Sequence, residues 1–442
     1  MKQFHMLKVV FNCWALFLGL ALIMLGNGLQ GSLIGLRASI EGFSISVTGL
    51  VMSGYFIGMI FGATTVPKII KRVGHVRTFG ALASLASASI LVHLVFLDPW
   101  VWWFMRVTTG LAYAGLYIVA ESWLNDMADN KSRGQLLSVY MLTLYGGMAG
   151  GQFLLNLASP EGFQLFVLIS VMVSVAVVPI LVSVSAAPPY ETIESVGLSQ
   201  LFRVSPLGIF GMFCSGIASG SIFGLGVVYG SEIGLSIKEI SFFMGILIIG
   251  GILLQYPIGW LSDRIGRRKT IILTCGIGGA VSLAASLSMG SNVMAYTGGA
   301  LVGGLCLPMY SLCAAHTNDY LMPKQMVAAS GTLVLVNGLG ATLGTPLTAF
   351  TMDYIGPQGF YLIIGLSFVL TFVFALWRST QREALASGDT DDFVPMAPSP
   401  ISAALNPDVE LEEIEGAAEE DKASVSASFD ELFEELNQNG EE

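Results

Sequence analysis

The sequence predicts an all-α membrane protein in which twelve transmembrane helices form two six-helix bundles related as parallel repeats. Three observations carry this prediction. Of the 442 residues, 54% are hydrophobic and only 12% are charged, whereas a soluble domain carries about 25% charged residues. The apolar residues fall in long runs rich in glycine and alanine, unlike the alternating segments of about ten residues that build a membrane barrel. Finally, motifs of the first half recur in the second half.

Twelve apolar windows lie between charged or turn-forming breaks. A bilayer core about 30 Å thick requires about 20 residues of helix at about 1.5 Å per residue. We place the windows at Val9–Gly28, Ser46–Val66, Thr78–Leu97, Val101–Asn125, Leu136–Leu157, Phe163–Val184, Pro206–Val228, Ile240–Trp260, Thr270–Met289, Val293–Ala314, Val327–Phe350 and Gly359–Trp377.

Charge divides the chain into a body and a tail. The net charge is -11, yet residues 380–442 hold 18 acidic residues against Arg382 and Lys422. So polar a segment buries too little apolar area to fold alone. We therefore expect an N-terminal bundle over 1–185, a cytoplasmic linker over 186–205, a C-terminal bundle over 206–379, and an acidic, mostly disordered cytoplasmic tail over 380–442.

The basic residues predict the orientation of the spans, because lysine and arginine are retained on the cytoplasmic side of short loops. With the N-terminus inside, 17 of the 20 basic residues fall in inner segments, Arg37 and Lys238 fall in outer loops, and Arg106 lies within the fourth span. Both termini are therefore expected in the cytoplasm of a bacterial inner-membrane protein. No small-residue cleavage site follows the first span, so we expect that span to be retained.

An internal repeat appears at an offset of about 192 residues. The segment from Gly259 to Thr270 follows the eighth span as Pro67 to Thr78 follows the second, and the pairs Asn125-Asp126 and Asn318-Asp319 close the fourth and tenth spans. Six spans repeated in the same orientation are typical of secondary transporters, which bind their solute between the halves near the midplane.

These motifs resemble the signatures of a transporter family. Residues Gly259 to Thr270 match G-x-L-a-D-R-x-G-R-[RK]-x, the loop signature of the major facilitator superfamily, and Arg106-x-x-x-Gly110 looks like its second signature. Three further stretches resemble the YcaD-type group of bacterial transporters: Glu121-Ser122-Trp123-Leu124-Asn125, Arg133-Gly134, and Pro308-Met309-Tyr310 with Ala315-His316-x-Asn318-Asp319. The resemblance covers Met1 to about Arg382 and implies a transporter of the major facilitator fold.

The loop signature predicts a cytoplasmic gate. Its glycines allow a tight turn, Asp263 can face the positive N-terminal end of a helix in the other half, and its arginines can pair with carboxylates at span ends. The predicted gate residues are Gly259, Asp263, Arg264, Gly266, Arg267, Arg268, Asp126 and Asp319. Alternatively, the basic residues only fix the topology, which leaves Asp263 unexplained. In the first-half copy, Lys71 and Pro67 replace the aspartate and the first glycine of the signature, so this copy departs from the pattern.

The fourth span carries both charged residues of the twelve windows, Arg106 and Glu121. Charge inside a membrane is costly and marks functional sites. At about 100° per residue, Tyr113, Tyr117 and Glu121 lie about 20°, 20° and 60° from Arg106, so the four share one helix face. We expect this face to line a central cavity. In that cavity Arg106 would recognise an anionic solute or act as an outer-gate residue. Alternatively, Arg106 has a structural role, in which it braces neighbouring helices or extends its charged end outward to the membrane surface.

Two residues are candidates for proton coupling, Glu121 and, near the same level of the tenth span, His316. Alternatively, Glu121 pairs with basic residues of the cytoplasmic loops at the inner gate, or it is a charge near the membrane interface with its hydrogen bonds satisfied. In the superfamily the first and tenth spans also line the cavity, so the resemblance implies that Asn27 and Tyr310 bind solute, while interhelical hydrogen bonding explains them equally well. The predicted solute-binding residues are Arg106, Tyr113, Tyr117, Asn27 and Tyr310.

Other patterns exclude several functions. The glycines at Gly54/Gly58/Gly62 and Gly216/Gly220/Gly224 predict helix-packing surfaces. The sequence has no phosphate-binding loop and no metal-ligand cluster, so we expect no ATP-driven transport, metal, cofactor or enzymatic activity. The fifth span lacks the Gly-Pro pair of drug/proton antiporters. In the tail, apolar residues at helical spacing within Phe429–Leu436 predict a docking helix for a protein partner or a transient helix without one.

Together these features predict a monomeric secondary transporter that moves a small polar or anionic solute by alternating access, with proton symport as the favoured energy source. It binds no nucleic acid, because its tail is acidic. An exporter of the same fold, or a sensor or scaffold that transports nothing and acts through the tail, are the alternatives.

Overall fold

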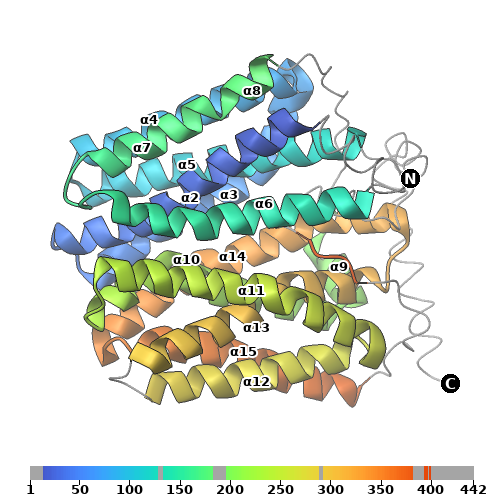
Figure 1. Cartoon of the computed structure of the whole chain (residues 1–442). Coiled ribbons are helices and arrows are strands. Elements are labelled where there is room, and N and C mark those ends of the chain that lie inside the picture. Colours follow the sequence, from blue (N-terminus) through green and yellow to red (C-terminus); the bar gives the residue numbers. More distant parts are fainter. Residues whose placement is uncertain are drawn as a thin grey trace.

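The computed structural model describes residues 13–127, 133–182, 196–287, 292–381, 393–396 and 398–399. Throughout these residues the regular structure is helical, and Figure 1 shows the helices running side by side in two groups, α2 to α8 above and α10 to α15 below. We call these groups the first and the second half. The predicted all-α membrane fold is confirmed. The predicted tail helix around Phe429–Leu436 lies outside the described residues.

The helices of the first half follow the predicted spans in order. They are α2 (Trp14–Ile40), α3 (Ile45–Val73), α4 (His75–Val95), α5 (Pro99–Met127), α6 (Arg133–Leu154), the short 3-10 helix η1 (Leu155–Leu157), α7 (Gln164–Val175) and α8 (Val177–Val182). The sixth predicted span is thus built from two helices, α7 and α8.

The second half repeats the pattern after a short helix in the connecting segment. It comprises α9 (Leu198–Val204), α10 (Pro206–Glu232), α11 (Ile237–Ile265), α12 (Arg267–Leu287), α13 (Asn292–Asn318), α14 (Pro323–Ile355) and α15 (Gly359–Ser379). In the described chain, ten helical segments are long and apolar enough to cross a membrane; α5, which carries Arg106 and Glu121, is not among them.

Several helices extend beyond the windows that hydropathy predicted. The first begins at Trp14 and continues past Gly28 to Ile40, so that Arg37 lies in its last turn rather than in an outer loop. There Arg37 pairs with Glu41 at 2.6 Å. A helix can continue past the bilayer core where side chains or water satisfy the unpaired backbone groups at its end. A hydropathy window does not detect such an extension.

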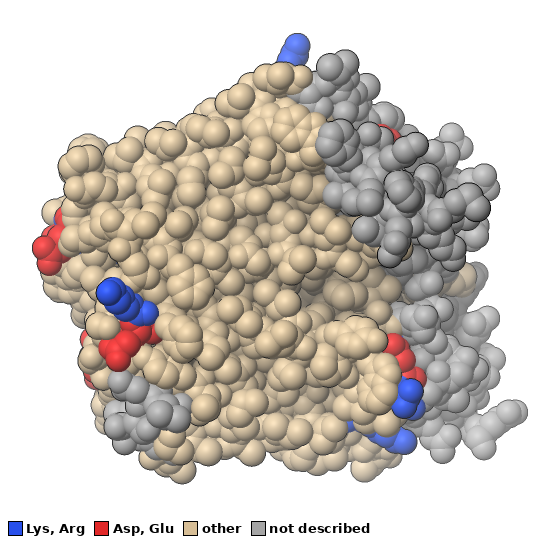
Figure 2. All heavy atoms as spheres, in the orientation of Figure 1, with Lys and Arg blue, Asp and Glu red and all other residues tan. Residues whose placement is uncertain are grey.

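The surface of the molecule has a broad area without charged side chains. On the face shown in Figure 2, charged side chains of the described residues lie at the two ends of the molecule and along the upper edge, and the area between carries none. Exposed apolar residues such as Leu253, Leu287 and Tyr354 are 67%, 86% and 91% exposed. A soluble monomer rarely exposes so continuous an apolar surface, whereas lipid tails cover it readily.

Glycines bring the helices of each half into close contact, as their spacing predicted. A Cβ added at Gly58 of α3 would overlap the carbonyl oxygen of Val107 in α5, and one at Gly216 of α10 would overlap the carbonyl oxygen of Asn337 in α14. Without side chains at these positions the backbones approach and pack in the absence of a hydrophobic effect between the helices.

The two halves contact each other from the middle of the molecule, where Gly338 lies against Ile60, to one of its ends. We call the end with Trp14 and Ser379 the terminal end, and the end with Ile40 and Ile355 the far end. At the far end, the Ser46 backbone N–H of α3 donates to Asp353 Oδ2 of α14 at 2.8 Å, and the Ser46 hydroxyl donates to the same oxygen. A Cβ at Gly49 would overlap Ala349. The far end is therefore closed by contacts between the halves.

Candidate functional site

A cavity of about 180 Å³ lies between the two halves. Its walls come from α2, α3, α5 and α6 of the first half and from α10, α11, α13 and α14 of the second. Its polar lining comprises Asn27, Ser32, Tyr55, Arg106, Tyr117, Glu121, Tyr140, Tyr145, Gln152, Ser215, Ser219, Tyr310, Asn337 and Ser399. Solute sites of secondary transporters are built between repeats in this way.

Arg106 of α5 provides the positive charge of the cavity wall. Its side chain is 4% exposed, and its guanidinium carbon lies 4.6 Å from the centre of the Tyr55 ring. Within the described part of the chain, Nε and Nη1 have no hydrogen-bond partner. The aromatic face offsets part of the cost of burying the cation, but the two unsatisfied donors leave room for an acceptor.

A polar cluster continues the wall beside Arg106. The Asn27 amide of α2 donates to the Tyr117 hydroxyl of α5 at 3.0 Å and to the Tyr55 hydroxyl of α3 at 3.2 Å. One amide thereby joins three helices of the first half. The two phenol hydroxyls are also hydrogen-bonded to each other, so one of the two O–H groups is used within the cluster and the other remains as a donor.

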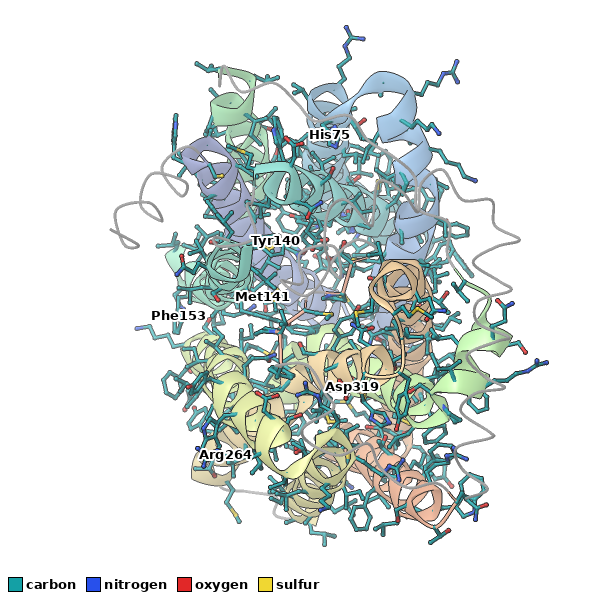
Figure 3. The ribbon with its side chains drawn as sticks, turned by 90° about the vertical axis from the view of Figure 1, so that its right-hand side faces the viewer. His75, Tyr140, Met141, Phe153, Arg264 and Asp319 are labelled. Atoms are coloured by element: carbon teal, nitrogen blue, oxygen red, sulfur yellow. The ribbon has the colours of Figure 1, made fainter. Side chains whose placement is uncertain are left out.

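Glu121 lies one turn beyond Tyr117 and is fully buried. Its Oε1 accepts a hydrogen bond from the Tyr140 hydroxyl of α6 at 2.7 Å. In Figure 3, which looks on to the terminal end, Tyr140 lies toward the centre of the molecule, whereas Arg264 lies at the periphery. A carboxyl buried among helices is costly unless it serves a function or is well bonded, and this one reaches the cavity.

The structure brings most, but not all, of the predicted site residues together. Asn27, Arg106, Tyr117, Glu121 and Tyr310 all line the cavity. Tyr113 does not: it is completely buried behind the wall, with its ring 6.2 Å from that of Tyr55. Helical periodicity places Tyr113 on the same face of α5 as Arg106, but α3 covers this part of α5. Gly110 has no side chain, so the backbone of Tyr55 in α3 can approach it closely.

His316 is also placed differently from the prediction. It is 5% exposed and lines a separate small cavity together with Arg268, Tyr320 and Arg378. The central cavity, where Glu121 lies, does not include it. Glu121 and His316 lie at similar depths in repeat-related spans, but this did not bring them together. The face of α13 that carries His316 points away from α5.

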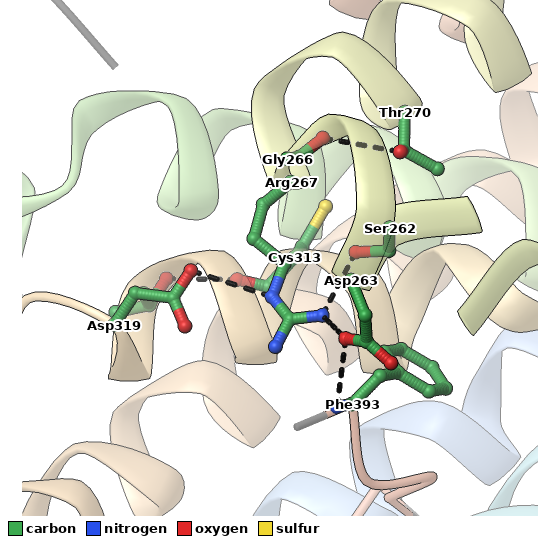
Figure 4. A network of polar contacts seen from close by, with 9 residues as sticks. Ser262, Asp263, Gly266, Arg267, Thr270, Cys313, Asp319 and Phe393 are labelled. Atoms are coloured by element: carbon green, nitrogen blue, oxygen red, sulfur yellow. Dashed lines mark hydrogen bonds and ion pairs between the residues drawn. The ribbon is translucent and has the colours of Figure 1, made fainter. Parts of the chain in front are cut away.

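The loop signature forms a compact polar network at the terminal end (Figure 4). Helix α11 continues through Asp263 to Ile265, Gly266 turns the chain at φ 90°, and α12 begins at Arg267. Gly74 makes the same turn between α3 and α4 at φ 86°. In this left-handed region a side chain is disfavoured, which explains the glycine in both copies.

Arg267 is the centre of this network. Its Nη1 donates to Asp263 Oδ1 at 2.6 Å and to Ser262 Oγ at 2.9 Å, while its Nε lies 3.4 Å from Asp319 Oδ2. The pairing proposed from the sequence between a signature arginine and Asp319 is present. It joins α12 to the end of α13 within the second half, and a gating role stays a prediction.

Other gate candidates have different surroundings. In the described residues the partners of Asp263 are Arg267 and the backbone N–H of Phe393, at 2.9 Å, and not the N-terminus of a helix in the other half. Arg264 stacks on Trp260 at 3.9 Å. Asp126 is exposed. In the first half, His75 occupies the place of Arg267 and lies 2.8 Å from Ser122 Oγ.

Asp263→Asn is expected to lower the transport rate while the protein stays folded. The amide keeps the size of the side chain but removes the charge facing Arg267, which is 3% exposed. Initial uptake rates in proteoliposomes and the melting temperature measure the two effects. Glu161→Gln, a change to an exposed carboxylate outside the network, is the matched control. Unchanged turnover in Asp263→Asn would leave topology as the only role of the signature.

Sequence reasoning missed three contributors to the site. Tyr55 and Tyr140 come from the second and fifth spans, where a tyrosine within a glycine-rich stripe is the available signal. The third is a piece of the tail, Phe393 to Ser399, whose described residues lie against the second half and reach the cavity. Its only sequence signal is a short apolar interruption of the acidic, proline-rich tail.

Comparisons with known proteins agree with this architecture. Residues 16–255 and 208–408 match the model of the Major Facilitator Superfamily. The uncharacterised MFS-type transporter YcaD of Escherichia fergusonii is 28% identical over 368 residues, covering 82% of this chain and 94% of that protein. An uncharacterised MFS-type transporter of Enterobacter sp. (strain 638) is 29% identical over 358 residues, covering 80% and 92%.

Solved structures show the same fold. The nucleoside transporter NupG superposes with a TM-score of 0.67 at 14% identity, covering 83% of this chain and 98% of that chain. A bacterial homologue of the human lysosomal transporter Spinster, inward-facing and unoccupied, gives 0.65 at 15% identity, covering 84% and 95%. The Escherichia coli fucose:proton symporter FucP gives 0.54 at 15% identity, covering 84% and 99%. At these identities the likeness concerns the fold alone.

Proposed function

The chain belongs to the major facilitator superfamily, and from this premise we propose that it is a secondary active transporter of a small anionic or polar solute. One observation carries the proposal: Arg106, buried on the wall of a cavity between the halves, has two guanidinium nitrogens without a partner among the described residues. A buried cation is costly in a membrane protein, and an anionic group of the solute would satisfy it.

Alternating access accounts for the arrangement of the halves, which we take as residues 1–185 and 206–379. Contacts between α3 and α14 close the far end, including the bond from Ser46 to Asp353. Toward the terminal end the described tail residues Pro398 and Ser399 adjoin the cavity together with Glu121 of α5 and Tyr140 of α6. Solute entry from the far side requires the contact between Ser46 and Asp353 to open while the terminal ends of the halves close.

Proton coupling through Glu121 is the favoured energy source. A carboxyl in contact with the cavity can take up and release a proton as the cavity changes sides, and the Tyr140 hydroxyl can donate to its charged form. The fold is shared with FucP, a fucose:proton symporter. The solute of this chain follows from its own cavity, where Arg106 favours an anion.

Uptake by purified protein in proteoliposomes tests the proposal. Vesicles are given a panel of carboxylate- and phosphate-bearing metabolites, nucleosides and sugars, each with and without an inward proton gradient. We expect saturable uptake of at least one anionic solute, which the gradient accelerates. Efflux driven by an opposing gradient would identify an exporter. No flux of any solute, together with a cellular defect on tail deletion, would instead favour a sensor or scaffold.

For the orientation, we propose that the terminal end faces the cytoplasm of the bacterial inner membrane. Lys269 at the start of α12 and Lys238 at the start of α11 are both exposed and lie at opposite ends of α11. In spheroplasts of a cysteine-free background, an impermeant maleimide should label Lys238→Cys from outside and should label Lys269→Cys only after lysis. The reverse pattern would overturn the orientation.

A further inference from the structure

The tail returns to the molecule at the loop signature. The Phe393 backbone N–H donates to Asp263 Oδ1 at 2.9 Å (Figure 4), and its ring lies against Gly259 of α11. A Cβ added at Gly259 would overlap this ring, so the absence of a side chain there provides the space for Phe393. The guanidinium of Arg267 lies 5.9 Å from the same ring.

From Phe393 the segment continues along α13. The Met396 N–H donates to Ser311 Oγ at 3.0 Å, and the Met396 carbonyl accepts from the same hydroxyl at 3.2 Å. The Met396 side chain is 4% exposed. A single serine thus bonds both backbone groups of one tail residue, and main-chain hydrogen bonds of this kind hold linear peptides in grooves.

The end of the segment enters the cavity. Ser399 is 1% exposed, its carbonyl accepts from Ser330 Oγ of α14 at 3.3 Å, and both Pro398 and Ser399 belong to the lining. The Ser399 hydroxyl lies against the carboxyl of Glu121 in the first half. The segment thereby runs from the signature of the second half to the candidate coupling residue of the first.

We propose that the terminal ends of α11, α13 and α14 form a binding groove for the described tail residues 393–396 and 398–399, and that this docked segment closes the terminal entrance of the cavity. Docking is autoinhibitory, because the segment occupies the space that solute must cross and lies between terminal ends that must come together when the far end opens. Release of Phe393 from Gly259 opens the entrance. The groove is defined without reference to solute, so its test is independent of the transport proposal.

Cys306 reports on the entrance, since it lines the cavity and is 1% exposed. In full-length protein with Cys13, Cys214, Cys275 and Cys313 changed to alanine, a small methanethiosulfonate reagent modifies Cys306 at a rate measured by mass spectrometry. We expect Phe393→Ala and Gly259→Ala each to raise this rate at least about tenfold. The first removes the ring, and the second adds a methyl where the ring lies.

Two controls match these changes. Phe163→Ala removes an equal ring that is 58% exposed, and Gly146→Ala adds a methyl at a helix position with no atom within 4 Å. Both should label at the parental rate. Equal rates in the parent, Phe393→Ala and Gly259→Ala, in protein that elutes as a single species, would overturn the proposal.

A reversible cross-link tests docking if a variant fails to fold. A Cβ at Gly259 lies 3.0 Å from Phe393 Cγ, one bond from the Cβ of Phe393, which is close to disulfide geometry. In the Cys306-only protein, Gly259→Cys with Phe393→Cys should form a disulfide on mild oxidation and label Cys306 slowly. Reduction should then raise the rate at least about tenfold. Absence of the disulfide, or equal rates before and after reduction, would refute docking.

Discussion

Arg106→Gln is expected to weaken the binding of an anionic solute at least tenfold, which corresponds to about 1.4 kcal/mol. The guanidinium can offer two parallel hydrogen bonds to a carboxylate or phosphate, and its Nε and Nη1 have no partner among the described residues. Arg106→Lys should retain part of the affinity, because the charge remains while the paired donors are lost.

The measurement is equilibrium binding to detergent-purified protein, after a melting-temperature screen of carboxylates and phosphates has identified a ligand. A ligand at a hundred times its dissociation constant stabilises the folded state by about 2.7 kcal/mol, so a bound solute raises the melting temperature. If Arg106→Gln binds as tightly as the parent while both variants only become less thermostable, Arg106 braces α3 against α5 through Tyr55, and the anionic-solute proposal fails.

Glu121→Gln is expected to abolish proton-driven accumulation while solute exchange continues. Glutamine keeps the shape of the side chain and an oxygen that accepts from Tyr140, whose hydroxyl now lies 2.7 Å from Oε1, but it cannot bind or release a proton. Uptake with and without an inward proton gradient, compared with counterflow in preloaded vesicles, separates the two activities.

Tyr140→Phe is the matched control, since it removes the hydrogen bond and leaves the carboxyl. It should still accumulate solute in response to the gradient. Accumulation by Glu121→Gln at the parental level would show that the proton, if it is the coupling ion, binds elsewhere. Both variants need the docked tail segment to be released for turnover, so each is measured in full-length protein and in the Phe393→Ala background.

The amino-acid sequence alone was sufficient to predict the fold class. The length of each apolar run sets how many helices can cross a bilayer, and the recurrence of Gly259 to Thr270 reveals the repeat, because both properties are local. Helical periodicity was also enough to bring Arg106, Tyr117 and Glu121 onto one face of α5, since about 3.6 residues per turn fix the angle between them.

Which neighbours meet that face was decided by tertiary packing alone. Because Gly110 has no side chain, α3 packs over Tyr113 and brings Tyr55 next to Arg106. Helix α6 contributes Tyr140, which bonds Glu121. His316 of α13 lines a different cavity. The docked residues Phe393 to Ser399 have no helical period, and their partners lie 85 and 130 residues away, at Ser311 and Asp263. Periodicity defines the faces of a single helix, but contacts between distant segments depend on how backbones approach one another, and sequence spacing contains no measure of that approach.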